Sequence, residues 1–386
     1  MFKKHQEAFF ALVKAGLWEN ANKNQNQNEY RFEGLDWDEV QRLAEEQSVV
    51  GLVAAGFNQL TAYRLPLTEK LTLLGKCQLI EQRNLAMNDF IAKMFARLKD
   101  EGIAPLLMKG QGVAQCYERP LWRASGDVDL LLTEKDYQAA KYLLLPEATS
   151  VEQEYTSFKH IAMHFGDVEV ELHGCLHTRL SKRLDASIDT LQDEMFREKK
   201  FGVWNNGGVP VPVPAPEYGV LFVLTHILKH YYVEGIGLRQ VCDWCRLLWT
   251  YRDVIDRKTL ECRLKKIRLT TEWKAFAAVA VDYLGMPVDA MPLYSPDLRW
   301  SRKANHIMSF IFKTGHFGHN RQRVKPKTYL GGKLRSTHRK FSDFAHHAFD
   351  FPVDSARFFW GIFTDGFAAA TRGGNRRSSE KLKMKS

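Results

Sequence analysis

The chain has 386 residues, of which 45% are hydrophobic and 26% are charged, so it is too apolar for a disordered protein and long enough for more than one folded domain. Its net charge of +10 is unevenly distributed. Residues 301–386 contain 18 Lys and Arg against 5 Asp and Glu, whereas the preceding residues are close to neutral. An anionic partner is therefore expected at the C-terminal segment.

The spacing of the cysteines and the length of the apolar runs indicate the cellular compartment in which the protein is expected. The six cysteines are scattered along a large chain, which is not typical of a secreted disulfide framework. Lys14 interrupts the N-terminal apolar stretch and no small-residue cleavage site follows it, so no signal peptide is expected. No apolar run approaches the roughly 18 residues that span a bilayer. We expect a cytoplasmic protein, and peripheral attachment to a membrane stays an open alternative.

The apolar periodicity of residues 1–98 predicts an N-terminal helical region. Asp36 is a suitable N-cap for a helix that has acidic residues in its first turn. A longer helix is expected over residues 67–100 from its apolar periodicity, and Gly102, a typical residue after a helix end, would terminate it. Its predicted apolar face consists of Leu71, Leu74, Ile80, Leu85, Phe90 and Met94.

Residues 99–215 predict a small domain of strands and helices. Short apolar runs indicate the strands, Thr133 is a suitable N-cap for the second helix, and Gly166-Asp167 predicts a tight turn between the last two strands. A loop rich in Gly and Pro is expected over residues 202–216. The elements are predicted in the order strand, helix, strand, helix, strand, strand, over residues 103–108, 110–117, 127–132, 134–145, 160–165 and 168–173.

The helical pattern returns over residues 216–290. Residues 291–386 form a basic region whose prolines and glycine pairs predict loops, short helices and a frayed terminus. The fold class expected from the four regions is α+β, in which a small mixed sheet with its helices is flanked by N- and C-terminal helical regions.

The most informative residues are two aspartates on the second predicted strand. Asp127 and Asp129 alternate with apolar residues, so both point to one face, as do Glu169, Glu171 and His173 on the last strand. An isolated Asp-x-Asp strand is most often a solvated surface. A pair of carboxylates beside a third, however, suits a divalent cation, Mg²⁺ or alternatively Mn²⁺. Periodicity does not decide whether Glu169 or Glu171 is the third carboxylate.

A glycine-containing turn and two polar residues precede the aspartates. Lys109, Gly110 and Gly112 lie where a strand passes into a helix, and backbone N–H groups at such a turn suit a triphosphate. Lys109 or Arg123 would add charge-assisted contacts to the same phosphates. Ser125 would either hydrogen-bond a phosphate oxygen or close the turn.

These motifs resemble a known superfamily. Lys109-Gly110, Arg123, Asp127-Val-Asp129 and Glu171-Leu-His173 are similar to the pattern of the uncharacterised bacterial nucleotidyltransferase family, within the DNA polymerase β-like superfamily. Abortive-infection toxin nucleotidyltransferases have a similar arrangement. The resemblance extends over about residues 30–290 and implies a polymerase β-like nucleotidyltransferase core.

The resemblance also implies roles for individual residues. Asp127, Asp129 and Glu171 would bind the metal and act in catalysis, and Gly110 would lie in the nucleotide-binding turn. Two departures affect the phosphate contacts. Residues 109–112 replace the Gly-Ser pair usual in the superfamily, and the interval to the aspartates is longer than usual.

Three weaker patterns occur in the helical region. His226 and His230 have the spacing of a helical zinc site, but a helix face that packs against the catalytic domain is the favoured interpretation. Cys242 and Cys245 have a metal or redox spacing but lie in a helical pattern without a second cysteine pair, which favours a structural role.

Arg239 forms the third pattern together with Asp243. The two residues share a helix face, and an ion pair four residues apart accounts for them. Since the family resemblance extends to this helix, contact of Arg239 with a nucleotide phosphate is the alternative.

Basic and aromatic residues are mixed in the C-terminal segment. Such a mixture suits RNA, an anionic membrane surface, or a solvated basic face over a small core. An aromatic run at residues 358–363 follows the basic residues Arg321, Arg323, Lys325, Lys327, Lys333, Arg335, Arg339 and Lys340.

The function that these features predict is Mg²⁺-dependent transfer of a nucleoside monophosphate from an NTP to an acceptor hydroxyl, with release of pyrophosphate. The acceptor would be a protein side chain, a tRNA end or a small molecule. If it is a tRNA end, the enzyme would resemble a toxin that modifies tRNA. The alternative from another class is a non-catalytic protein that uses the same fold to bind nucleotide or nucleic acid.

Overall fold

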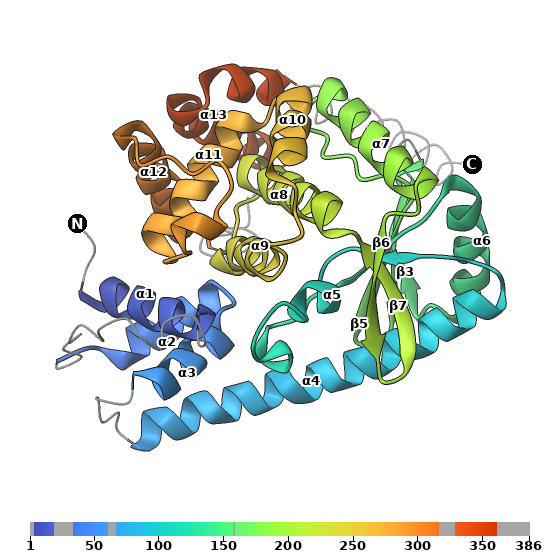
Figure 1. The fold of residues 1–386 in the computed structure, drawn as a ribbon, viewed down its shortest axis with the longest axis horizontal. Helices are drawn as coiled ribbons and strands as arrows, with labels where there is room; N and C mark the ends of the chain where they lie inside the picture. The colour runs from blue at the N-terminus through green and yellow to red at the C-terminus, as the bar shows by residue number, and fades with distance from the viewer. Residues whose placement is uncertain (1–3, 19–33, 61–66, 157–158, 316–328, 361–386) are drawn as a thin grey trace.

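The computed structural model describes residues 4–18, 34–60, 67–156, 159–315 and 329–360. Figure 1 shows a sheet with its helices on one side and a larger group of helices on the other. A long helix, α4 (Leu67–Asp100), runs along one edge of the molecule, from the N-terminal helices to the sheet. Within the described residues, no helix combines the length and the apolar character needed to cross a bilayer.

Three shorter helices precede α4: α1 (Lys4–Leu17), α2 (Trp37–Glu46) and α3 (Val50–Gln59). The Asp36 carboxylate caps α2 by accepting a hydrogen bond from the backbone N–H of Glu39, so the predicted N-cap is confirmed. These helices share a core with the C-terminal half of the chain, because Phe9 of α1 stacks edge-on against Phe312.

Helix α4 has the predicted bounds, but part of its predicted apolar face is wrong. Leu71, Leu74 and Leu85 are exposed. The buried stripe instead runs through Leu73, Cys77, Asn84, Met87, Ile91, Met94 and Leu98. Helix α4 contacts the N-terminal helices along one part and the β-hairpin of residues 201–214 along another, so some of its leucines face solvent. The stripe that contacts the rest of the chain includes a polar residue, Asn84.

The sheet has five strands in the order β1-β2-β5-β4-β3. Strands β2 and β5 are parallel and the other neighbours are antiparallel, which makes the sheet mixed, as predicted. The helices between strands are α5 (Gln111–Ala114) and α6 (Glu134–Leu144), and Thr133 caps α6 as predicted. The strands are β1 (Leu106–Leu107), β2 (Val128–Leu131), β3 (Ser150–Val151), β4 (His160–Phe165) and β5 (Val168–His173).

The predicted Gly- and Pro-rich loop is wrong, because these residues form a β-hairpin. Strands β6 (Phe201–Asn206) and β7 (Val209–Pro214) pair antiparallel, and Gly207 and Gly208 form the turn with positive φ angles of 59° and 93°. The prolines of β7 occupy every second position. Since alternate backbone N–H groups point to opposite edges of a strand, these prolines remove donors from one edge and leave the other free to pair.

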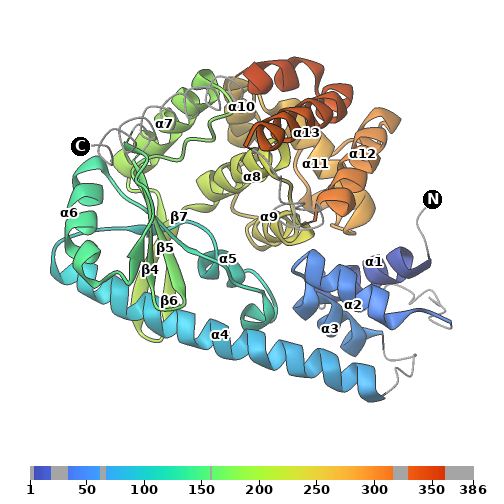
Figure 2. The same ribbon diagram turned by 180° about the vertical axis from the view of Figure 1, so that it is seen from behind.

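Most of the remaining helices form a group to one side of the sheet (Figure 2). This group contacts the N-terminal helices, where the backbone N–H of Leu238 donates to Gln47 Oε1 at 2.9 Å. The prediction of short helices and loops beyond residue 290 is wrong for α12 and α13, which have 17 and 22 residues. Pro292 and Pro296 precede α12 and therefore do not interrupt it. The helices are α7 (Lys182–Arg197), α8 (Pro216–Val233), α9 (Leu238–Thr250), α10 (Arg257–Ile267), α11 (Thr270–Ala278), α12 (Leu298–Thr314) and α13 (Tyr329–Asp350).

The predicted basic segment is only partly described. Residues 321–327 and 361–363 lie outside the described residues, so the RNA and membrane interpretations stay predictions. In the described part of the aromatic run, Phe358 is buried in the core and Trp360 is exposed.

Candidate active site

The two parallel strands bring three carboxylates together at one edge of the sheet. Asp129 of β2 and Glu171 of β5 are direct neighbours in the strand register, and Asp127 immediately precedes β2. Asp127, Asp129 and Glu171, which we call the carboxylate cluster, offer oxygens that all lie within 4.8 Å of one another. Glu169 is grouped instead with Glu152 and His164. The strand register therefore places Glu171 in the cluster, a choice that periodicity alone could not make.

Asp129 is the most enclosed member of the carboxylate cluster. Its side chain is 1% exposed, and its Oδ1 lies 2.9 Å from both Lys109 Nζ and His173 Nε2. Burial raises the pKa of Asp129, but Lys109 and His173 together hold it below its usual value. Within the described part of the chain, its second oxygen, Oδ2, has no hydrogen-bond partner. A buried carboxylate oxygen without a donor is a suitable ligand for a cation.

The other two carboxylates differ in how their charge is balanced. Glu171 Oε2 lies 3.2 Å from His160 Nε2 and from His173 Nε2, and these contacts outweigh burial and lower the pKa of Glu171. The pKa of Asp127 is raised, mainly by the adjacent Asp129 and then by burial. The cluster therefore retains a negative charge that further positive charge would stabilise.

The turn after β1 depends on a glycine. Gly110 has φ +56° and ψ −121°, and a Cβ at this position would lie 3.3 Å from the carbonyl oxygen of Asp127. A residue with a side chain would be strained there, so the turn can approach the carboxylate cluster only through glycine. Gly112, in contrast, packs against Val213 of β7, where a Cβ would lie 3.1 Å from a methyl carbon.

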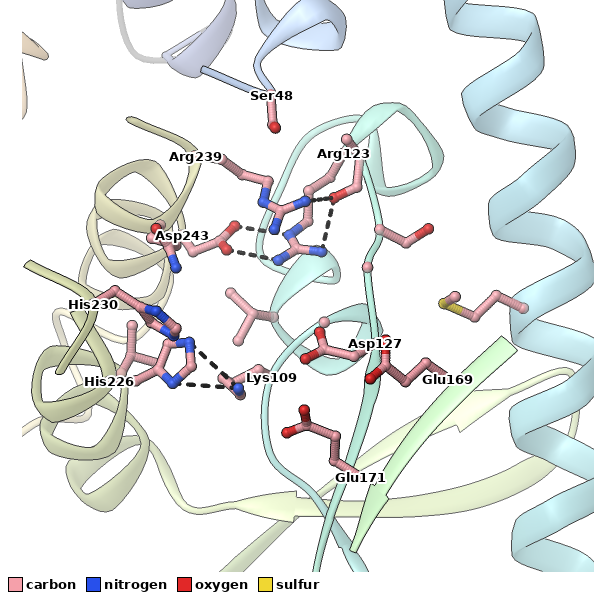
Figure 3. Close-up of a pocket in the computed structure, with 18 of the residues that line it drawn as sticks. Ser48, Lys109, Arg123, Asp127, Glu169, Glu171, His226, His230, Arg239 and Asp243 are labelled. Carbon is pink, nitrogen blue, oxygen red and sulfur yellow. Dashed lines mark hydrogen bonds and ion pairs between the residues drawn. The ribbon is translucent and has the colours of Figure 1, made fainter. Parts of the chain in front are cut away.

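A cavity of about 1040 Å³ lies beside the carboxylate cluster. Sheet residues form one wall, and α8 and α9 form the facing wall, as Figure 3 shows. This volume reaches the upper end of the range of typical ligand pockets, roughly 300–1,000 Å³. The positively charged residues that line it are Arg83, Lys109, Arg123, Lys229 and Arg239.

Residues 33–285 match the family described as "uncharacterised nucleotidyltransferase", a span that includes the whole sheet, α8 and α9. The chain belongs to this family. It is therefore a nucleotidyltransferase, an enzyme that transfers nucleoside monophosphate groups. No curated protein and no solved structure gives a significant match to it.

Arg123 of the nucleotidyltransferase is engaged within the protein. Its Nε and Nη2 donate to the two carboxylate oxygens of Asp243 at 2.8 and 2.7 Å, and Tyr117 also donates to Asp243 at 2.7 Å. Asp243 therefore forms its ion pair with Arg123, whereas the sequence interpretation assigned it to Arg239. Helical spacing could not reveal this, because the partner comes from a loop that is 120 residues away.

Arg239 lies beside that pair at the cavity wall (Figure 3). Its Nη1 donates to the carbonyl oxygen of Ala124 at 2.8 Å. Burial, followed by repulsion from Arg123, lowers the pKa of Arg239 to about 10. Ser125 also lines the cavity, and among the described residues its buried hydroxyl has no hydrogen-bond partner. Both side chains are thus suited to an anion in the cavity.

One histidine of α8 contacts the turn after β1, and another pairs with a residue at the end of α8. Both ring nitrogens of His226 lie 3.4 Å from Lys109 Nζ, and His230 Nδ1 lies 3.1 Å from Glu234 Oε2. With Lys229, these residues form a polar stripe that lines the cavity. The sequence interpretation missed this stripe as part of the site, although polar residues at spacings of three and four along an apolar helix signal it.

The cysteines of α9 are core residues. Cys242 and Cys245 are fully buried, and burial raises the pKa of both thiols well above the usual value. Since a thiol must lose its proton to bind metal or to react, the structural interpretation of this pair agrees with the fold.

Two amides that the sequence interpretation missed hold the loop before β2. Asn84 of α4 donates to the carbonyl oxygens of Leu121 at 2.7 Å and Arg123 at 2.8 Å. Gln111 of α5 in turn donates to Asn84 Oδ1 at 3.1 Å. Helix α4 therefore fixes the segment that leads to Asp127.

Proposed function

We propose that this nucleotidyltransferase moves a nucleoside monophosphate from an NTP to an acceptor hydroxyl with release of pyrophosphate, and that it requires Mg²⁺ at Asp127, Asp129 and Glu171. The carboxylate cluster beside a cavity lined by five lysine and arginine side chains is the observation that carries this proposal. The cluster would hold metal, and the cavity would hold the triphosphate and the acceptor.

The residues present fit a hard divalent cation. All three ligands are carboxylates, and the buried Oδ2 of Asp129 lacks a hydrogen-bond partner among the described residues. When bound, Mg²⁺ would supply charge that polarises the α-phosphate and stabilises the leaving pyrophosphate. Mn²⁺ has similar ligand preferences and is the alternative.

The protein's own groups would orient the reactants. Arg239 and Ser125 would contact phosphate oxygens, and Gly110 would let the backbone of the turn approach them. The acceptor oxygen would attack the α-phosphorus, and the bond from that phosphorus to the bridging oxygen of pyrophosphate would break. One carboxylate of the cluster would receive the acceptor proton.

One contact favours the non-catalytic alternative. Lys109 Nζ already lies 2.9 Å from Asp129, so an internal cation compensates part of the charge that a metal would balance. In that alternative the protein binds a nucleotide in the same cavity and transfers nothing. A hydroxyl on a protein, on tRNA or on a small molecule stays the proposed acceptor for the enzyme.

Pyrophosphate release and calorimetry together test the proposal. The wild type is incubated with each of the four NTPs, with and without Mg²⁺, beside the double variant Asp127→Asn with Asp129→Asn. Glu152→Gln, an exposed carboxylate outside the cluster, is the control. We expect Mg²⁺-dependent release from the wild type and the control, and at least a ~10³-fold loss in the double variant. Equal turnover by the double variant contradicts the proposal, and tight NTP binding without release supports the alternative.

A further inference from the structure

A second cluster of metal-ligand side chains lies between α12 and α13, outside the part of the chain that matches the family. His306 is on α12, and His346 and Asp350 are four residues apart on α13. This spacing puts both α13 residues on one face of the helix. Figures 1 and 2 both show α13 beside α12, and the rings of His306 and His346 stack with centroids 5.4 Å apart.

Each residue of this α12–α13 cluster (His306, His346 and Asp350) has one buried polar atom without a hydrogen bond among the described residues. Asp350 is 2% exposed, and its Oδ2 has no hydrogen-bond partner within the described ranges. The same holds for His306 Nδ1 and His346 Nε2. One buried polar atom without a hydrogen-bond partner costs roughly 1–3 kcal/mol. The contact of 3.4 Å between His306 Nδ1 and Asp350 Oδ2 offsets only part of this cost and leaves His346 Nε2 unsatisfied, so the cluster calls for an explanation.

We propose that His306, His346 and Asp350 bind Zn²⁺ at a site separate from the carboxylate cluster. Each residue offers one ligand atom, and these atoms lie within 4.8 Å of one another. Two imidazoles and one carboxylate are a typical zinc donor set, which leaves a fourth position for water. A path for the ion exists, because the His306 side chain is 41% exposed.

The zinc ion would link α13 to the body of the molecule. Helix α13 also packs on α8, where His347 contacts the rings of Tyr231 and Tyr232 with centroid separations of 4.3 and 5.0 Å. Helix α8 in turn lines the cavity of the nucleotidyltransferase. The ion would therefore fix α13 against the back of this cavity wall.

A simpler arrangement competes with zinc. His306 Nδ1 lies 3.4 Å from Asp350 Oδ2, so a protonated His306 would form an ion pair with the carboxylate. That separation is longer than the roughly 2.7–2.9 Å of a charge-assisted hydrogen bond, so this ion pair compensates the carboxylate only in part. The ion pair predicts no metal binding and gives His346 no role.

The test uses the full chain, stripped of metal and carrying Cys175→Ser to remove the thiol of the separate Cys175, His177 and Asp189 cluster. Thermal unfolding is measured with and without Zn²⁺, and Co²⁺ serves as a spectroscopic substitute. The variants are His346→Ala and Asp350→Asn. The matched control is His338→Ala, an exposed histidine on the same helix.

We expect Zn²⁺ to raise the melting temperature of the parent and of His338→Ala. Zn²⁺ affinity should fall at least ~100-fold in His346→Ala and Asp350→Asn, because even residues that only support a metal ligand change affinity by roughly 10- to 100-fold. The isosteric Asp350→Asn keeps the test valid if His346→Ala does not fold. No Zn²⁺ effect on the parent, or an equal effect in all variants, overturns the proposal.

Discussion

The two walls of the cavity differ in how the charges of their basic residues are compensated. On the sheet wall, burial lowers the pKa of Lys109 and of His173, but Asp129 and Glu171 raise both above their usual values. On the helical wall, burial, with repulsion from Lys109, lowers the pKa of His226 and of Lys229. Neighbouring carboxylates therefore compensate the charges of Lys109 and His173 on the sheet wall. On the helical wall, burial and repulsion outweigh the attraction of carboxylates for His226 and Lys229.

This difference indicates where an anion is needed. A buried cation whose pKa is lowered costs free energy in the folded protein, and a bound anion would offset that cost. Arg239, at the end of the same wall, has its pKa lowered in the same way. The helical wall is therefore the proposed side for the triphosphate, and the sheet wall the side for the metal.

Exchanging one lysine on each wall gives the largest expected contrast. Lys109→Met removes the lysine that pairs with the buried Asp129 carboxylate and leaves only His173 beside it, so we expect the free energy of unfolding to fall by about 3–5 kcal/mol. Lys229→Met removes a cation whose charge is unfavourable, so the expected change is less than about 1 kcal/mol or a gain. Urea denaturation at pH 7 measures both, and losses of equal size would show that the walls do not differ.

Two arginines in contact with the cavity provide a smaller contrast. Arg239→Gln is expected to weaken NTP binding about tenfold, or ~1.4 kcal/mol, with little effect on stability, because it removes a proposed phosphate contact. Arg123→Gln should destabilise the protein, because Asp243 would lose a buried partner. Calorimetry with NTP and urea denaturation separate the two effects. Unchanged NTP affinity in Arg239→Gln would rule out its assignment to phosphate.

The sheet wall could be predicted from the sequence to a large extent. Strands with period-two alternation were placed correctly at residues 160–165 and 168–173, and the shared face of Asp127 and Asp129 follows from the same alternation. The choice between Glu169 and Glu171 depends on the register of two strands that are about 40 residues apart. Register is a tertiary property, so the sequence pattern left that choice open.

The helical wall was harder to predict. Helix α8 is buried nearly all round, so only the spacing of its polar residues, and not an amphipathic face, indicates the polar stripe. The ion pair of Asp243 forms with Arg123 of a distant loop rather than with Arg239 on the same helix. The hairpin β6–β7 was also missed, because prolines argue against a strand unless their missing donors all fall on one edge.

The smallest expected effect tests charge balance away from the cavity lining, in the loop after β5. Hydrogen bonding to Cys175, and then to Asp189, raises the pKa of His177 from 6.5 to about 9 despite partial burial. Because the folded pKa is above the unfolded one, this stabilisation is full below pH 6.5 and is lost as the pH rises to about 9. Solvent exposure limits it to less than about 1 kcal/mol. The difference in unfolding free energy between wild type and His177→Asn should therefore shrink between pH 6 and roughly pH 9.5. A constant difference over this range would show that His177 is not held in its charged form, and that Asp189 does not balance its charge.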